Sequence, residues 1–172
     1  MKQMTLITAI AASFLTLTAQ AENYYIEGSL GNTKIESESG SSFGVLGGYK
    51  FYEQDKVKVS AELGYNKYIE LEAQTFFGKA TAKTSSIALG SKLSYSPVQN
   101  IEVFSRIAYE TMMVEVDILG ETSTGSSNEF SYALGASYDV AKNFSIGTQY
   151  KYSPLDEGEN LTNVTISGNY RF

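Results

Sequence analysis

The chain has 172 residues, and its 13 lysine and arginine side chains against 19 aspartates and glutamates give a net charge of −6. It contains no cysteine and no histidine, which excludes disulfides, thiolate nucleophiles, histidine metal ligands and Ser-His-Asp triads. A pI near 4.7 argues against nucleic-acid binding, which normally needs a basic surface. We therefore expect one non-enzymatic domain with no catalytic, cofactor or metal site.

The N-terminal segment has the three parts of a secretory signal peptide. Lys2 supplies a positive start, residues 4–17 form a short apolar stretch, and Ala19-Gln20-Ala21 is a small-x-small cleavage site. The apolar stretch is shorter than the ~20 residues that a transmembrane helix needs. We predict a cleaved signal peptide over residues 1–21 and a mature domain over residues 22–172. Export without cysteine fits a Gram-negative envelope protein.

The mature chain alternates between apolar and polar side chains with a period of two, which indicates β-strands. Eight such stretches of about 9–11 residues are expected, the strand length that crosses a membrane at a tilt. In chain order they cover residues 24–30, 43–51, 57–66, 87–95, 101–110, 130–138, 144–152 and 163–172. One face of each stretch is apolar and aromatic, and the other face is small, polar or charged.

This alternation fits a soluble sandwich or lipocalin-like barrel, and also a membrane barrel with its apolar face toward lipid. The connections decide between them, because tight ones (52–56, 96–100, 140–143) alternate with long polar ones (32–42, 67–83, 111–129, 153–161). Short turns at one end and long loops at the other are typical of membrane barrels. Aromatic residues also gather at two levels near the strand ends, as membrane interfaces select. The pattern predicts an all-β fold, an eight-stranded antiparallel up-and-down transmembrane β-barrel.

The polar faces would place charged side chains inside a narrow lumen. Burying unpaired charges costs several kcal/mol each, so we expect a salt-bridge network that plugs the barrel, with Arg106 bridging Glu102 and Glu110 on its own strand. The alternative is a narrow or gated ion path. The predicted interior charge network consists of Glu27, Lys50, Lys58, Glu62, Lys92, Glu102, Arg106, Glu110, Lys151 and Arg171.

The long connections carry most of the acidic residues. These are Glu36, Glu38, Glu70, Glu72, Glu115, Asp117, Glu121, Glu129, Asp156, Glu157 and Glu159, offset only by Lys34, Lys67, Lys79 and Lys83. Such loops could hold divalent cations that bridge lipopolysaccharide or dock a basic partner, but no spacing resembles a calcium loop and simple solvation is favoured. Apolar residues at 69, 71, 76 and 77 fit either strands that extend above the membrane or an adhesive patch.

Several segments resemble the small eight-stranded outer-membrane barrels, namely the OmpA transmembrane domain, the OmpX/Ail group and the opacity-type proteins. They are residues 24–31 (YYIEGSLG), 47–51 (GGYKF), 62–65 (ELGY) and the closing stretch 164–172. The resemblance implies a C-terminal signal for the barrel-assembly machinery, made here of Val164, Ile166, Gly168, Tyr170 and Phe172. It also implies protruding strands. The enzymatic barrels of similar form use a histidine, which this chain lacks.

The sequence thus predicts a non-enzymatic integral outer-membrane protein with a structural or surface role in envelope integrity, adhesion or host-defence resistance. The alternative is a small pore or conduit for ions or hydrophobic molecules, and a soluble ligand-binding barrel is least favoured because the inward set is charged. The expected surroundings are outer-membrane lipid and lipopolysaccharide. We expect a monomer, no nucleic-acid partner and an extracellular partner, if any, through the acidic loops.

Overall fold

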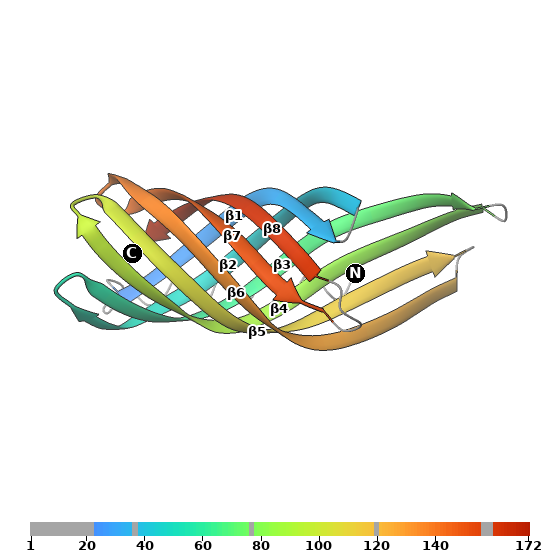
Figure 1. Ribbon diagram of the computed structural model, residues 1–172, viewed down its shortest axis with the longest axis horizontal. Helices are drawn as coiled ribbons and strands as arrows, with labels where there is room; N and C mark the ends of the chain where they lie inside the picture. Colours follow the sequence, from blue (N-terminus) through green and yellow to red (C-terminus); the bar gives the residue numbers. More distant parts are fainter. Residues whose placement is uncertain (1–22, 36–37, 76–77, 119–120, 156–159) are drawn as a thin grey trace.

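The chain forms a closed β-barrel. The computed structural model describes residues 23–35, 38–75, 78–118, 121–155 and 160–172. They form eight strands: β1 (Tyr24–Ile35), β2 (Glu38–Gln54), β3 (Val57–Thr75), β4 (Gly78–Val98), β5 (Ile101–Ile118), β6 (Glu121–Ala141), β7 (Phe144–Pro154) and β8 (Asn160–Arg171) (Figure 1). Each strand pairs antiparallel with the next, which confirms the predicted fold class. Within the described residues, no helix is long and apolar enough to cross a membrane.

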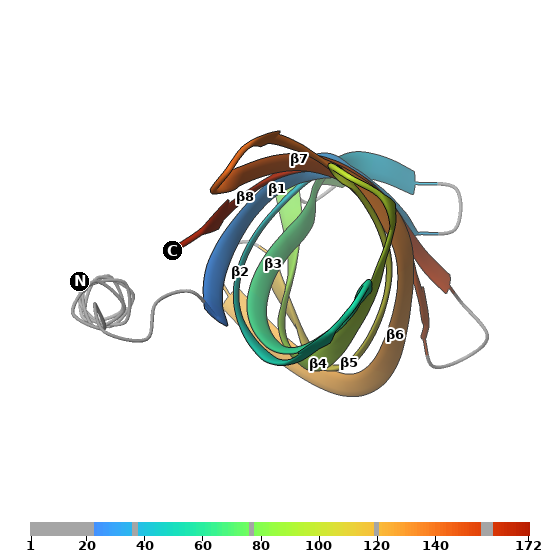
Figure 2. The ribbon, with the colours of Figure 1, turned by 90° about the vertical axis from the view of Figure 1, so that its left-hand side faces the viewer.

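The first and last strands close the ring. β1 pairs with β8 from Tyr25↔Arg171 to Ile35↔Leu161. Seen from the end where the short turns lie, the strands surround one central lumen (Figure 2). Closure gives every strand two neighbours, which a lipid environment requires because it offers no water to unpaired backbone groups.

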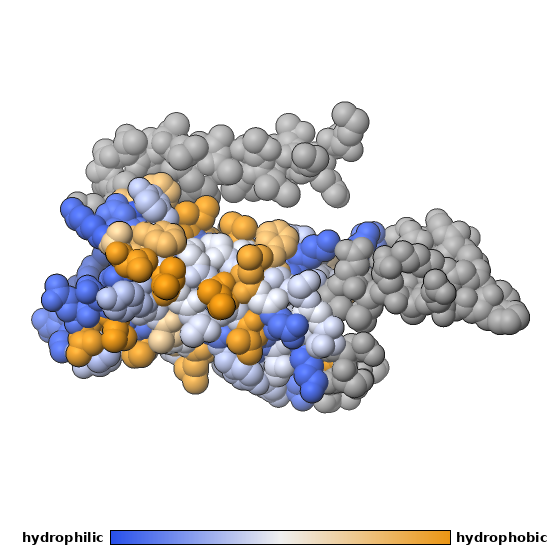
Figure 3. Space-filling view, turned by 90° about the horizontal axis from the view of Figure 1, so that it is seen from above, coloured by the Kyte–Doolittle hydropathy of each residue, from blue (hydrophilic) through white to orange (hydrophobic). Residues whose placement is uncertain are grey.

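The two faces of the sheet are inverted relative to a soluble protein. Apolar side chains on the outside stay exposed, such as Leu30 at 70%, Leu134 at 69% and Ile166 at 72%. Charged side chains on the inside are buried, such as Glu27 at 6% and Glu110 at 2%. Figure 3 shows apolar residues along the barrel wall and hydrophilic residues at the short-turn end. This distribution suits a barrel whose wall faces hydrocarbon.

Aromatic rings on the outer surface pair across strands at both ends of the apolar wall. At the short-turn end, the ring centroids of Tyr24 and Tyr49 lie 4.9 Å apart across two strands. The rings of Tyr170 and Phe172, two residues apart at the end of the chain, contact each other edge to face at 5.3 Å. At the opposite end, the partners are Phe43 with Tyr65 and Tyr109 with Phe130. Two belts of this kind mark the two interfaces of a membrane.

Two-residue turns join the strands at one end. Residues 55–56, 99–100 and 142–143 connect the three hairpins there, as the tight connections predicted. Asp55 and Asn100 have positive φ values of 53° and 71°, a conformation that short polar side chains tolerate. Main-chain bonds such as Ser96 N–H to the Lys56 carbonyl, 2.9 Å, tie neighbouring turns together.

At the other end, the prediction of long polar loops is wrong, whereas the expected extension of a strand through residues 69 and 71 is confirmed. Most of their residues continue the strands, so that β3 reaches Thr75 and β5 reaches Ile118 before the chain turns. Above the membrane both faces of a strand contact water, which removes the apolar alternation that marked the strands below. Ladder hydrogen bonds to a neighbouring strand hold these extensions in place, with pairs as far as Thr75↔Gly78 and Ile118↔Glu121.

Some predictions concern parts of the chain that the structure does not describe. The signal peptide and the side chains of Ile69, Leu71, Phe76 and Phe77 lie outside the described residues. Of the eleven acidic residues predicted for the long connections, only Glu115 and Glu129 have described side chains.

Glycines on the inner face make room for large neighbours. A Cβ at Gly135 would lie 2.4 Å from the Phe104 ring and 2.6 Å from the carbonyl oxygen of Thr148. A Cβ at Gly28, on the outer face, would meet nothing within 4 Å. The lumen therefore needs glycine at the first position, and the wall does not need it at the second.

We expect Gly135→Ala to lower the free energy of unfolding by about 1–3 kcal/mol, because the added methyl group overpacks the lumen. Urea unfolding of the barrel refolded in detergent micelles measures this loss. Gly28→Ala is the matched control and should leave the unfolding midpoint unchanged; equal losses in both variants would contradict the packing argument.

Candidate functional site in the barrel lumen

The lumen contains charged and polar side chains from all eight strands. The ten charged residues predicted for the interior lie in five separate groups rather than in one network. The groups are Glu27 with Glu62 and Arg106; Glu110 with Lys151; Lys58 and Lys92 with Glu102; Lys50 with Glu53; and Arg171 with Asp139.

The first group crosses the lumen around Arg106 on β5. Its Nη1 and Nη2 donate to the two carboxylate oxygens of Glu27 at 3.0 and 2.8 Å, a bidentate pair. Its Nε donates to Glu62 at 3.2 Å, and Nη1 also donates to the amide oxygen of Gln149 at 2.5 Å. The hydroxyl of Tyr25 donates to Glu62 at 2.5 Å. These five residues, the Arg106 cluster, block the lumen with groups from four strands.

The expectation that Arg106 bridges its neighbours on β5 is wrong. Positions four apart on a strand are separated by ~13 Å, so Glu102 and Glu110 lie far to either side of it. Each glutamate pairs with a lysine from another strand instead: Glu102 with Lys92 at 2.8 Å and Glu110 with Lys151 at 2.7 Å. In a narrow barrel, partners on other strands, whether neighbouring as for Lys92 or further round the ring as for Lys151, are closer than partners along a strand.

A second group surrounds Glu110 nearer the long hairpins. Its Oε1 accepts hydrogen bonds from Lys151 at 2.7 Å and from Ser131 at 2.6 Å. Its Oε2 accepts from Tyr68 at 2.9 Å and from Ser86 at 3.0 Å, and Lys151 also contacts the Tyr68 hydroxyl. We call these five residues the Glu110 cluster. Four donors satisfy a carboxylate that is 2% exposed, which is the condition for burying a charge.

Apolar side chains pack beyond the Glu110 cluster. Tyr68, Met112 and Leu161 are buried together, and Ile35 and Leu155 pack against them. Leu161 is only 1% exposed. This packing lies at the long-hairpin end and adds an apolar layer to the two charged clusters.

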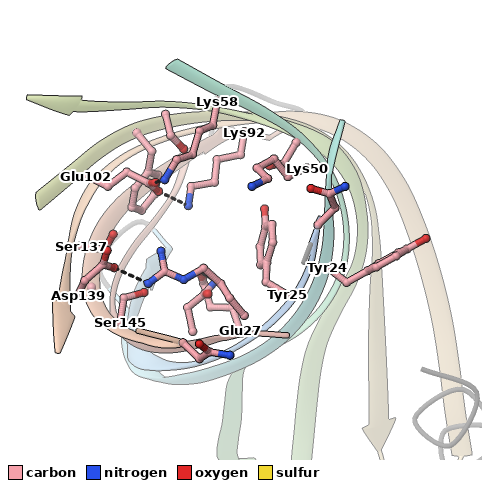
Figure 4. A pocket seen from close by; sticks show the side chains of 18 of the residues that line it. Tyr24, Tyr25, Glu27, Lys50, Lys58, Lys92, Glu102, Ser137, Asp139 and Ser145 are labelled. Carbon is pink, nitrogen blue, oxygen red and sulfur yellow. Dashed lines mark hydrogen bonds and ion pairs between the residues drawn. The ribbon is translucent and has the colours of Figure 1, made fainter. Parts of the chain in front are cut away.

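The lumen contains a small and a larger cavity lined by described residues. A volume of about 60 Å³ lies between the two clusters, space for very few water molecules. A larger volume of about 510 Å³, the short-turn cavity, lies on the other side of the Arg106 cluster. Figure 4 shows Lys50, Lys58, Lys92 and Glu102 pointing into it, with Tyr25 and Glu27 deeper inside. The lumen is therefore hollow at the short-turn end and filled toward the long hairpins.

Several important residues were missed by sequence reasoning. Tyr68 lies in a segment expected to be a loop, although the inward alternation through Glu62 and residues 64 and 66 continues to it. Continued alternation would likewise have placed Asp139, the partner of Arg171, inside. A register shift between residues 50 and 52 turns Glu53 inward, and no sequence signal announces it.

The residues of the predicted assembly signal lie on the outer face of the closing strand. Val164, Ile166 and Tyr170 are 52%, 72% and 46% exposed. Gly168 and Phe172 continue the same alternation toward the short-turn end. These residues form part of the apolar wall rather than of the lumen.

The described lumen offers little for metal or acid–base chemistry. No group of three or more aspartate, glutamate, histidine or cysteine residues suited to a metal is present in the described part of the chain. The inward carboxylates Glu27, Glu62, Glu102 and Glu110 each contact a cationic side chain. This arrangement favours structural ion pairs.

The family model for the outer membrane protein beta-barrel domain matches residues 5–172. The chain belongs to this family. The match spans nearly the whole sequence and agrees with the closed eight-stranded sheet, the apolar wall and the polar lumen. No curated protein sequence matches the chain.

Solved outer membrane barrels share the fold at low sequence identity. Neisserial surface protein A is 15% identical with a TM-score of 0.69, over 87% of this chain and 97% of that chain. Ail, the attachment invasion locus protein of Yersinia pestis, is 14% identical with a TM-score of 0.64, over 87% and 97%. The outer membrane enzyme PagL is 13% identical with a TM-score of 0.53, over 86% and 99%. Enzymes and surface proteins thus share this architecture, so the fold alone does not set the function.

We expect Arg106→Gln to lower the free energy of unfolding by about 3–5 kcal/mol, because it leaves two buried carboxylates without their cation. Adding Glu27→Gln and Glu62→Gln should recover most of that loss. Urea unfolding in micelles, followed by the heat-modifiable gel band, measures both effects.

Arg171→Gln is the matched control. Its pair with Asp139 has side chains that are 31% and 34% exposed, so the loss should stay within about 1 kcal/mol. A triple variant no more stable than Arg106→Gln would argue against uncompensated charge as the cause.

Proposed function

We propose that this protein is a non-enzymatic barrel that anchors a projecting β-sheet in the outer membrane and keeps its own lumen closed to ions. The observation that carries the proposal is the filling of the lumen at two levels, by the Arg106 cluster and by the Glu110 cluster. Through the anchored barrel the protein would support envelope integrity, and through the sheet it would serve adhesion or host-defence resistance.

The long hairpins support a role at the surface. The last pair between β6 and β7 is Tyr132↔Tyr152, yet β6 continues to Glu121. Among the described residues, the stretch Glu121–Ser131 has no strand neighbour on its β7 side. An open edge of this kind offers backbone donors and acceptors to a partner strand. Long hairpins face the cell exterior in outer membrane barrels.

The charge of the hairpins selects among partners. Ail of Yersinia pestis crystallised in complex with the heparin analogue sucrose octasulfate, which is a polyanion. The long connections of the present chain are acidic, so they would repel such a ligand. We infer that any extracellular partner of this protein is basic, and that lipopolysaccharide contacts its outer wall.

The proposed absence of enzymatic activity rests on the residues available. The chain has no histidine and no cysteine. An acyl-release assay on lipopolysaccharide and phospholipid vesicles tests this part directly, because the fold is shared with an outer membrane enzyme. Release of fatty acid above that of empty vesicles would overturn it.

The remaining parts of the proposal concern assembly. We propose that the barrel inserts as a monomer through its C-terminal strand, with Phe172 and the alternating residues before it read by the barrel-assembly machinery. We also propose that residues 1–21 are removed on export.

In planar lipid bilayers we expect the purified barrel to show no reproducible open state. An ion crossing the lumen would have to displace side chains that hold each other by charge-assisted hydrogen bonds, as at Arg106 and Glu110. A conducting outer membrane porin of larger strand number, inserted in the same way, is the positive control. Steady single-channel openings that disappear in Arg106→Gln would instead support the alternative of a gated pore, which the short-turn cavity favours.

We expect a chain lacking residues 70–83 to insert normally and to lose its surface role. The deletion removes the register pair Glu70↔Lys83 and everything above it, and leaves Lys67↔Ser85 in place. Binding of expressing cells to host-cell layers, with detergent sensitivity as the readout for envelope integrity, measures the two parts separately. Unchanged adhesion by the deleted chain would show that this hairpin is not the contact surface.

A further inference from the structure

Three lysine side chains from adjacent strands gather on one wall of the short-turn cavity. Lys50 lies on β2, Lys58 on β3 and Lys92 on β4, and Figure 4 shows their ammonium groups pointing into the cavity. The register explains the grouping. Lys50 lies opposite Ser60, which lies opposite Lys92, while Lys58 lies opposite Ser94. Small serines between the lysines leave room beside each ammonium group.

Within the described residues, two carboxylates accept hydrogen bonds from these three lysines. Glu102 accepts from Lys92 at 2.8 Å and from Lys58 at 3.3 Å, so one carboxylate faces two cations. Glu53 accepts from Lys50, but its side chain is 43% exposed and such a pair is weak in water. The three lysines and their two hydrogen-bonded carboxylates therefore carry together one positive charge more than negative.

The lysines lie next to the Arg106 cluster, and the charge of Lys92 also acts on Glu27 of that cluster. The Arg106 cluster, deeper in the lumen, holds two carboxylates and one guanidinium, which is a surplus of one negative charge. The described lumen is therefore polarised, with its positive end on the hollow side. Lys92 is held there, 7% exposed, with its ammonium 4.5 Å from the Phe104 ring centroid. In a protein of net charge −6, this is a local reversal of sign.

We propose that the short-turn cavity binds a phosphoryl group, as inorganic phosphate or as a monoester, with Lys50, Lys58 and Lys92 as its ligands. Each ammonium group offers three donors, and a dianion would neutralise the surplus charge and replace the weak contact with Glu53. The buried hydroxyls of Ser60 and Ser94 line the same wall. A volume of about 510 Å³ falls within the range of small-molecule sites.

The site faces the periplasm if the short turns lie there, as they do in outer membrane barrels. Its ligand then comes either from dissolved periplasmic phosphates or from a lipid headgroup at the inner leaflet. The chemistry of recognition is the same for both sources. This inference is independent of whether the hairpins serve adhesion, because it uses only the opposite end of the barrel.

Backbone amide shifts test the proposal on the full barrel refolded in maltoside micelles, which contain no phosphate. Titration with inorganic phosphate should shift the amides of Ser60 and Ser94 saturably, while that of Gly125 at the far end stays still. We expect Lys50→Gln and Lys58→Gln each to weaken binding about tenfold, since each removes a charge-assisted contact. Glu102→Gln should tighten binding about threefold by removing the competing carboxylate.

Lys56→Gln is the matched control, because this turn lysine donates to the Pro97 carbonyl and does not line the cavity. It should bind phosphate as the wild type does. The heat-modifiable gel band confirms that each variant is folded. Among these variants we expect Lys50→Gln to destabilise the barrel least, because its partner Glu53 is exposed.

A parallel titration with dihexanoyl phosphatidic acid distinguishes the sources. Shifts with inorganic phosphate assign a dissolved ligand, and shifts with the lipid alone assign a headgroup. The proposal is overturned if neither probe, at concentrations up to about 10 mM, shifts the amide signals of Ser60 and Ser94. It is equally overturned if binding is unaffected by Lys50→Gln and Lys58→Gln.

Discussion

The pairing of β1 with β8 is the contact on which the rest of the structure depends. It runs from Tyr25↔Arg171 to Ile35↔Leu161 and leaves no open edge at membrane depth. Lipid offers no partner to a free backbone group, so a sheet in the membrane must close. Closure with eight strands makes the interior narrow, and the outer wall must be apolar. The inward side chains then have to fit inside a confined space, and the charged ones have to find partners there.

That confinement explains the form of the ion pairs. Arg106 can meet Glu27 and Glu62 at about 3 Å because opposite walls are close. The same narrowness excludes enough water to screen these charges, so each must have a partner. Near the short turns the lumen widens, and the pair of Arg171 with Asp139 is about one-third exposed. One barrel thus contains buried ion pairs that fill the lumen and partly exposed ion pairs that water can reach.

Sequence alternation predicted which face of each strand points inward, because the membrane imposes a period of two on every residue that it contacts. It did not predict the partners of Arg106, since neighbours in sequence are not neighbours across a barrel. Nor did it predict the inward turn of Glu53, which follows a register shift. The strand ends were missed for a related reason: above the lipid both faces are wet, and no apolar alternation marks a strand such as the upper part of β6.

The two ends of the barrel differ because the filling is asymmetric. The Glu110 cluster and the apolar packing around Leu161 lie toward the long hairpins, and the Arg106 cluster separates them from the short-turn cavity. A barrel braced across its lumen in this way gives the projecting strands a rigid base. The paired extensions of β3 to β6 continue the ladders of the wall, from Leu63↔Leu89 to Ala80↔Ile118, with a register shift between Lys67 and Glu70. The buried clusters that fill the lumen and the extended ladders therefore belong to the same strands, while Lys50, Lys58 and Glu102 at the short-turn cavity belong to neither cluster.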